Sequence, residues 1–132
     1  QEIPKKNLHN IDMNLLVLIN NDNEIYLEKI IKGKLWHGLY SSPFFMIKND
    51  KMKWENSNNI TFSKPHLTIS IDHRVTNKKI KINTEFYFLK KCKKVSLSSD
   101  NWYNLSDIKV GMPRYQHKIL DIYRSEYENS YV

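Results

Sequence analysis

The sequence predicts an α+β domain in which a mixed β-sheet is covered by a C-terminal helix. Met13–Ile19 (MNLLVLI) is a short continuous apolar run, which is typical of a strand covered on both faces. Several later segments alternate apolar and polar residues with the period of two that a half-buried strand requires. After Pro113 the apolar residues change to helical spacing.

The first half of the chain divides into a linker, a hairpin and a loop. Residues 1–12 (QEIPKKNLHNID) are polar and aperiodic, which predicts an interdomain linker ahead of a domain at 13–132. This start without Met indicates the end of a longer protein. Asn20–Asn23 has turn chemistry and Glu24–Ile30 alternates, so a hairpin is expected with the preceding strand. Lys32–Pro43, with two of the three glycines, indicates a loop.

Short strands and one helix are expected in the second half. The segments expected to form strands are Phe44–Ile47, His66–Val75, Ile80–Phe88 and Asn101–Leu105. Pro113 suits the first turn of a helix. Residues at helical spacing follow it and predict the covering helix: Ile119, Leu120, Tyr123 and Tyr127.

Length and cysteine content exclude several classes of protein. A chain of 132 residues is expected to form one domain. It has no run of 18 apolar residues, which predicts no membrane span, and Gln1–Asn10 lacks the apolar core of a signal peptide. The lone Cys92 allows no internal disulfide and no zinc or iron–sulfur site, and it fits a reducing cytoplasm.

The net charge of +7 is consistent with nucleic-acid binding, because lysines near phosphates release condensed counterions. The composition offers a second explanation. There are 18 Lys against 3 Arg, with 15 Asn, 15 Ile and no Ala, and these are the preferences of A/T-rich codons. Charge therefore supports polyanion binding without establishing it.

Three stretches in register resemble the C-terminal domain of MutY-type adenine DNA glycosylases. Residues 33–43 (GKLWHGLYSSP) are similar to the family loop G-L-W-G-G-L-[YW]-x-F-P, and residues 61–67 (TFSKPHL) to T-F-S-H-x-H-L. Residues 102–105 (WYNL) and 110–113 (VGMP), followed by a helix, are similar to W-Y-x-L…V-G-L-P. The resemblance implies a Nudix-like fold in which the usual first helix, between Pro43 and Ile60, is lost or shortened.

The resemblance also implies a function in base excision repair. In this family the domain helps to recognise 8-oxoguanine opposite adenine in duplex DNA, while an N-terminal glycosylase domain excises the adenine. The implied partners are that duplex and that domain, with a monomeric chain and no membrane. The catalytic residues and the iron–sulfur cluster of the family would lie in the N-terminal domain, so no catalytic residue, metal or cofactor is expected here.

The resemblance implies that Phe62, Ser63, Lys64 and His66 contact the lesion or the DNA. 8-Oxoguanine differs from guanine by an O8 acceptor and a protonated N7, so a hydroxyl such as that of Ser63 is suitable for telling the two apart. Phe62 would position it. Lys64 replaces the histidine common in the family and suits a phosphate contact, while Pro65 forces Lys64 toward an extended conformation. For His66, an ordinary surface or packed strand histidine is an equal alternative.

Two other functions remain open. A diverged Nudix hydrolase would need the carboxylate box G-x5-E-x7-R-E-U-x-E-E-x-G to hold metal ions, but only Glu55, Asp50 and Asp72 are acidic between Lys29 and Thr84. A basic module that binds RNA or a protein is the third hypothesis. It draws on the run from Lys78 to Lys94, where seven lysines accompany one glutamate, although a solvated hairpin explains this run equally well. The Trp36 loop is expected to pack as a structural element.

Overall fold

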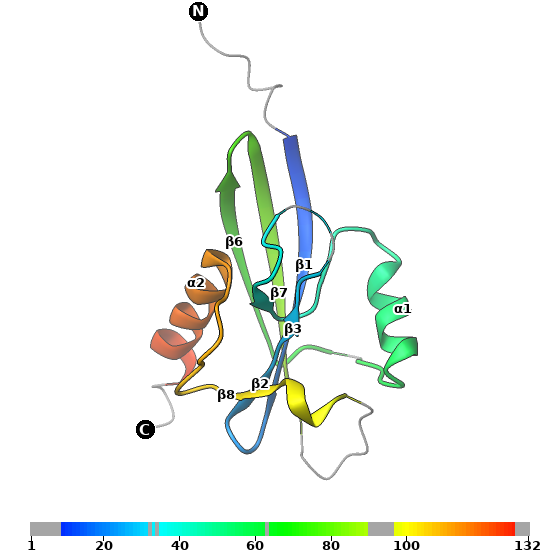
Figure 1. Cartoon of the computed structure of the whole chain (residues 1–132), viewed down its shortest axis with the longest axis vertical. Coiled ribbons are helices and arrows are strands. Elements are labelled where there is room, and N and C mark those ends of the chain that lie inside the picture. Colours follow the sequence, from blue (N-terminus) through cyan, green and yellow to red (C-terminus); the bar gives the residue numbers. More distant parts are fainter. Residues whose placement is uncertain (1–8, 32, 34, 63, 90–96, 129–132) are drawn as a thin grey trace, which may run out of the picture.

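A computed structural model describes residues 9–31, 33, 35–62, 64–89 and 97–128 as a mixed β-sheet between two α-helices (Figure 1). The main sheet has the order β6-β7-β1-β2-β8, with β5 also paired to β1, and β3 and β4 form a separate pair. The strands are β1 (His9–Asn20), β2 (Glu24–Tyr26), β3 (Glu28–Lys29), β4 (Tyr40–Ser41), β5 (Phe44–Phe45), β6 (Leu67–Val75), β7 (Lys78–Leu89) and β8 (Trp102–Asn104). The helices are α1 (Asp50–Ser57), the 3-10 turn η2 (Ser99–Asn101), α2 (Arg114–Tyr123) and the π-helical turn η3 (Arg124–Glu128).

The central strand β1 pairs with β7 in parallel along its whole length, from His9↔Lys78 to Asn20↔Leu89. Its side chains alternate between the two faces: Val17 joins the cluster under α2, and Leu18 joins the cluster on the α1 side. The prediction of a strand covered on both faces is confirmed. Because β1 begins at His9, the expected linker at 1–12 extends too far, and its residues 1–8 lie outside the described part of the chain.

The larger core lies between the sheet and α2. β6 and β7 run antiparallel and present alternate apolar residues to this face, and the helix adds its amphipathic side. The structure places Pro113 at the N-cap of α2, one residue before the first helical turn for which it was predicted. The residues that meet here include Met13, Ile69, Ile82, Phe86, Tyr115, Ile119 and Leu120.

A short helix, α1, covers part of the opposite face. The expectation for this interval was a lost or shortened helix; the structure has an eight-residue helix, so it is present. Its sequence shows no apolar periodicity and the helix has no buried residue, so the residue pattern gives no sign of it. Trp54 packs against the smaller cluster, which comprises Leu16, Leu18, Tyr26, Phe45, Tyr87 and Leu97.

The loop between β3 and β4 packs onto the α2 face. Gly33 and Gly38 have positive φ angles of 79° and 88°, which glycine adopts without the steric cost of a Cβ. Trp36 also has positive φ, at 61°, and its ring lies 4.8 Å from Tyr115 and 5.9 Å from Phe44, centroid to centroid. The predicted structural role of this loop is confirmed by these contacts.

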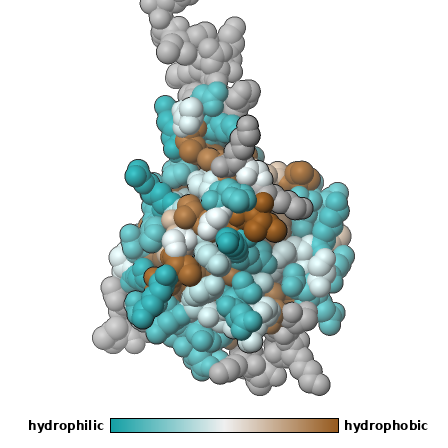
Figure 2. Space-filling model, in the orientation of Figure 1, coloured by the Kyte–Doolittle hydropathy of each residue, from teal (hydrophilic) through white to brown (hydrophobic). Residues whose placement is uncertain are grey.

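The face of the molecule drawn in Figure 2 combines hydrophilic side chains with apolar areas. Large apolar side chains that are exposed in the described part of the chain are Ile31, Met46, Ile47, Met52 and Phe88. Within the same residues, no helix has the length and apolar character needed to cross a membrane.

Candidate nucleic-acid interface

The residues predicted to contact the lesion lie in the connection between α1 and β6. Phe62 and Lys64 belong to this connection, and His66 directly precedes β6. Lys64 is exposed and Phe62 is half-buried. Ser63 lies outside the described residues, so its predicted contact with the modified base stays a prediction.

Phe62 is fixed to both α1 and β7. Its ring centroid lies 4.4 Å from that of Tyr87, with the planes tilted by 32°. Its backbone N–H donates a hydrogen bond of 3.0 Å to Oε2 of Glu55, on α1. Close aromatic pairs add stability beyond the area that they bury, about 0.5–1.5 kcal/mol. The position of Phe62 is therefore set by two elements from different parts of the chain.

His66 holds the other end of the segment against β7. Its backbone N–H donates to the carbonyl of Phe86 at 2.8 Å, which extends the pairing of β6 with β7 by one residue. Its Nδ1 accepts a hydrogen bond of 3.3 Å from the N–H of Phe88, and the two rings lie 5.2 Å apart. His66 thus has a structural role at the strand ends, although its side chain is exposed.

An ion pair lies beside the Phe62–Tyr87 contact. Nζ of Lys51, on α1, is 2.8 Å from Oε1 of Glu85, on β7. Burial lowers the pKa of Lys51, but the hydrogen bond and charge of Glu85 outweigh burial, so that pKa stands above its ordinary value. Burial, and then the charge of Glu85, raise the pKa of Tyr87. Lys51 is therefore engaged within the protein, whereas Lys64 presents its charge to solvent.

The carboxylates on the α1 side have separate structural roles. Glu28 accepts hydrogen bonds from the hydroxyl of Tyr26 at 3.0 Å and from Nε1 of Trp54 at 3.1 Å. Glu55 and Glu85 bind Phe62 and Lys51, as described above. No three His, Cys, Asp or Glu side chains come together as a metal site among the residues that the structure describes. Hard divalent cations need several such oxygen ligands at one point.

The basic run splits into two parts. Lys78, Lys79 and Lys81 lie on β7 and are exposed, and Nζ of Lys79 is 4.0 Å from a carboxylate oxygen of Asp72. Residues 90–96, with the remaining lysines and Cys92, lie outside the described residues. The hypothesis that this run binds nucleic acid stays a prediction.

The sequence alone did not identify the residues that hold Phe62 in place. Glu55 was noted only as an isolated carboxylate, and Tyr87 only as part of an alternating strand. The link between Phe62 and Tyr87 joins segments on either side of β6, so no local pattern reports it. The hydrogen bond from Phe62 to Glu55 spans a shorter stretch, but an acidic residue on a polar helix gives no signal of it.

The fold defines the class of this chain as Nudix-like. It superposes on the MutT protein of Methanosarcina mazei with a TM-score of 0.63 and 14% identity, over 90% of this chain and 96% of that one. It also matches the Ap4A hydrolase of C. elegans with a TM-score of 0.61 and 15% identity, over 92% and 98% of the two chains. The predicted α+β, Nudix-like fold is confirmed.

In sequence the chain is similar to adenine DNA glycosylases. It is 28% identical over 109 residues to the enzyme of Buchnera aphidicola subsp. Baizongia pistaciae, and 29% identical over 115 residues to that of subsp. Schizaphis graminum. These matches cover 79% and 82% of this chain but only 30% and 32% of the relatives, so the chain spans about a third of their length.

A solved structure links this sequence similarity to the fold. The C-terminal domain of mouse MUTYH, determined in a complex with human PCNA, matches with a TM-score of 0.62 and 8% identity, over 89% of both chains. The resemblance to the C-terminal, Nudix-like domain of adenine DNA glycosylases is thereby confirmed. No protein-family model matches the sequence.

Proposed function

We propose that this chain recognises 8-oxoguanine opposite adenine in duplex DNA, as the C-terminal domain of an adenine DNA glycosylase. The observation that carries the proposal is its sequence similarity to two such enzymes over four fifths of its length. A glycosylase domain would be its partner and would excise the adenine, with any iron–sulfur cluster in that domain. The setting would be the cytoplasm of a bacterium, at the nucleoid.

The geometry of the α1–β6 connection supports this function. Phe62 is bound to α1 and β7, and His66 to the end of β7, so both ends of the candidate segment are attached to regular structure. A base is read through a small number of positioned donors and acceptors, so a fixed support reduces the entropy that binding costs. Ser63 is the proposed reader of the base, and Lys64 the proposed contact to phosphate.

A diverged Nudix hydrolase is the rival function, since the fold is also that of MutT and Ap4A hydrolase. Its metal ions would need a group of carboxylates that point to one place. Glu28, Glu55 and Glu85 instead each bind different groups of the protein. This arrangement favours DNA recognition over metal-dependent hydrolysis.

The decisive experiment is a titration of labelled duplexes with the 132-residue chain, measured by fluorescence anisotropy at fixed salt. Duplexes that contain 8-oxoguanine:adenine, guanine:adenine or guanine:cytosine at one position are compared, together with a single-stranded RNA. The proposal expects the tightest binding to the 8-oxoguanine:adenine duplex. Equal affinities for the first two duplexes would contradict it, and tighter binding to RNA would favour the basic-module hypothesis.

A parallel assay separates the hydrolase. The chain is incubated with 8-oxo-dGTP and dGTP in the presence of Mg²⁺, and released phosphate and pyrophosphate are measured. No release above a protein-free control is expected. Steady turnover of either nucleotide would establish the rival function.

A further inference from the structure

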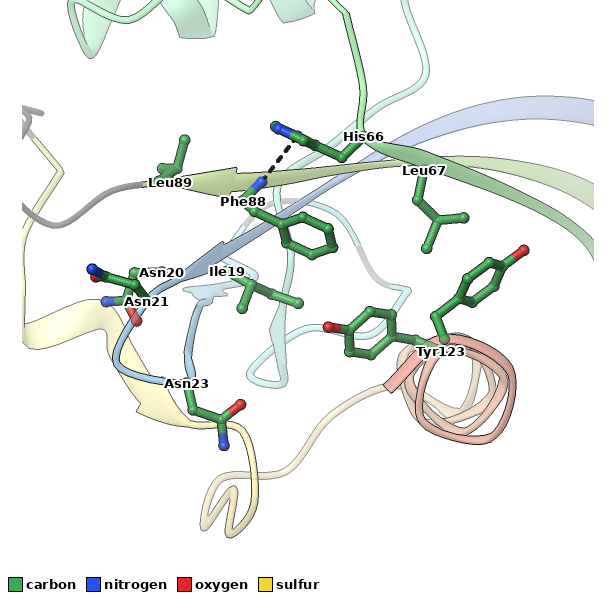
Figure 3. Close-up of a pocket in the computed structure, with 10 residues that line it drawn as sticks. Ile19, Asn20, Asn21, Asn23, His66, Leu67, Phe88, Leu89 and Tyr123 are labelled. Carbon is green, nitrogen blue, oxygen red and sulfur yellow. Dashed lines mark hydrogen bonds between the residues drawn. The ribbon is translucent and has the colours of Figure 1, made fainter. Parts of the chain in front are cut away.

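A cleft of about 820 Å³ lies between the ends of β1 and β7 and the C-terminal end of α2 (Figure 3). Ile19, Leu67 and Phe88 point into the space between the strand ends and the helix. Tyr123 and Tyr127 form its helical side, and His66 lies at the same end of β6. The cleft therefore adjoins the connection that the proposed function uses, and His66 belongs to both.

Four of the described residues that line this cleft carry rings: His66, Phe88, Tyr123 and Tyr127. Phe88, at the end of β7, is 39% exposed. Its ring lies 6.2 Å from that of Tyr123 and 5.2 Å from that of His66. Tyr123 stacks in turn on the buried Phe86, at 5.2 Å with an interplanar angle of 18°. Phe88 is thus a solvent-facing ring supported by two others.

The polar groups of the cleft indicate what it does not bind. Among the described residues that line it, none is Lys, Arg, Asp or Glu, so these residues offer no countercharge for a phosphate. The carboxamide of Asn20 is used by the turn, since Oδ1 accepts from the N–H groups of Asp22 and Glu24. The carboxamide of Asn23 donates to Oγ of Ser106. The cleft therefore suits a neutral, planar group that is held by stacking.

A nucleobase is such a group, and stacking on aromatic side chains binds any base because every base has a π-face. Nδ1 of His66 accepts a hydrogen bond from the N–H of Phe88, so in the neutral imidazole the ring hydrogen is on Nε2, which is a donor. Lys64 lies two residues before His66 and is exposed, so a strand whose phosphate meets Lys64 would pass beside the cleft.

We propose that this cleft is a site for one unpaired nucleobase, held on Phe88 beside the strand that Lys64 contacts. The proposal rests on the proposed function for the source of the base, which is bound DNA. The cleft would be a second contact to the DNA, besides Ser63, and it would accept any of the bases. A base that leaves the stacked duplex near the lesion would bind in the cleft by stacking, without base-specific hydrogen bonds.

The test compares a lesion-free duplex that carries a one-nucleotide bulge with the same duplex fully paired. The chain is expected to bind the bulged duplex more tightly, and Phe88→Ala to reduce that preference about fivefold or more. Met52→Ala, which removes another exposed apolar side chain on α1, is the matched control and should keep the preference. Equal binding of the two duplexes by the wild-type chain would overturn the proposal, as would an unchanged preference in Phe88→Ala.

A second measurement does not depend on any variant. 2′-Deoxyadenosine is titrated into the ¹⁵N-labelled chain, and the backbone amide signals of His66 and Phe88 are expected to shift while that of Met52 stays in place. Absence of such shifts would contradict the site. If the wild-type chain prefers the bulged duplex but does not prefer the 8-oxoguanine:adenine duplex, only the proposed function is contradicted. The failure of the nucleobase site and the failure of the proposed function can therefore be told apart.

Discussion

The ring of Phe62 lies 4.4 Å from the ring of Tyr87, and this contact attaches the connection between α1 and β6 to the sheet. Tyr87 is itself buried, with 4% of its surface exposed, on the same face as Trp54. A residue beside the proposed lesion reader is therefore supported from the core of the domain.

Replacing Tyr87 with leucine is expected to weaken both the fold and the proposed lesion selectivity. The aromatic contact to Phe62 is lost, at a cost of about 0.5–1.5 kcal/mol in the free energy of unfolding. Urea unfolding measures the first effect and duplex titration the second. Tyr103→Leu is the matched control, because its ring pairs with Tyr40, away from Phe62. A Tyr87→Leu chain with full selectivity would show that the position of Phe62 is irrelevant to binding.

Ser63→Ala is expected to lower the preference for the 8-oxoguanine:adenine duplex over the guanine:adenine duplex. Loss of one good base contact typically removes about 1–3 kcal/mol of discrimination. Titration of the labelled duplexes gives the ratio of affinities. Ser70→Ala, at an exposed position on β6 where the hydroxyl donates to Asn83, should leave that ratio as it is. The same ratio in Ser63→Ala and in the wild-type chain would rule out the proposed reader.

Lys64→Ala is expected to weaken binding to every duplex by a similar factor. A lysine that neutralises one phosphate contributes about one unit to the slope of log affinity against log salt. The slope should therefore flatten by about one in this variant. Lys109→Ala removes a comparably exposed lysine before α2 and serves as the control. If the salt slope of Lys64→Ala equals that of the wild-type chain, Lys64 does not touch phosphate.

Gln116→Leu is expected to destabilise the fold without affecting DNA selectivity. The Gln116 side chain is fully buried, accepts from the Ser42 N–H at 2.8 Å and donates to Ser42 Oγ at 3.0 Å. Leucine leaves these buried groups unpaired, at a cost of about 1–3 kcal/mol. Urea unfolding measures the loss, with His117→Leu on the exposed side of α2 as the control. Equal stability of the two variants would mean that water or another group replaces the amide.

The stability of the domain is expected to fall as the pH drops below about 6.5. Burial, and then the charges of Lys118 and Arg114, hold the pKa of His73 below its ordinary value of 6.5. The unfolded chain then binds more protons than the folded chain in this range, so acid favours unfolding. His73 does not change the stability at pH values above its pKa in the unfolded chain, and its destabilising contribution stops growing below its pKa in the folded chain.

His73→Gln tests this pH dependence. Removal of the imidazole should flatten the dependence of the free energy of unfolding on pH just below 6.5. Urea denaturation at a series of pH values measures it, and His117→Gln controls for the loss of a histidine as such. An identical pH profile in His73→Gln and the wild-type chain would mean that another group titrates.

Most strands and the C-terminal helix were predictable because their patterns are strong. The apolar run of β1 and the alternation of β6 and of most of β7 reflect burial that the structure confirms, although at the end of β7 Tyr87 is buried and Phe88 is exposed. Helix α1 was not predictable, since it buries no residue and touches the core mainly through Trp54. The parallel pairing of β1 with β7 could not be predicted from the sequence either, because the segments from β2 to β6 separate these two strands along the chain.

Periodicity and short motifs were sufficient for the fold class and for the resemblance to adenine DNA glycosylases, because burial imposes its period locally and glycine and proline positions report local geometry. The contacts that hold the candidate site in place could be identified only in the folded chain. Phe62 meets Tyr87, and Phe88 meets Tyr123, only when distant segments are brought together by the sheet and α2. Such contacts leave no period in the sequence, so the anchor of the segment and the aromatic cleft beside it emerged from tertiary packing alone.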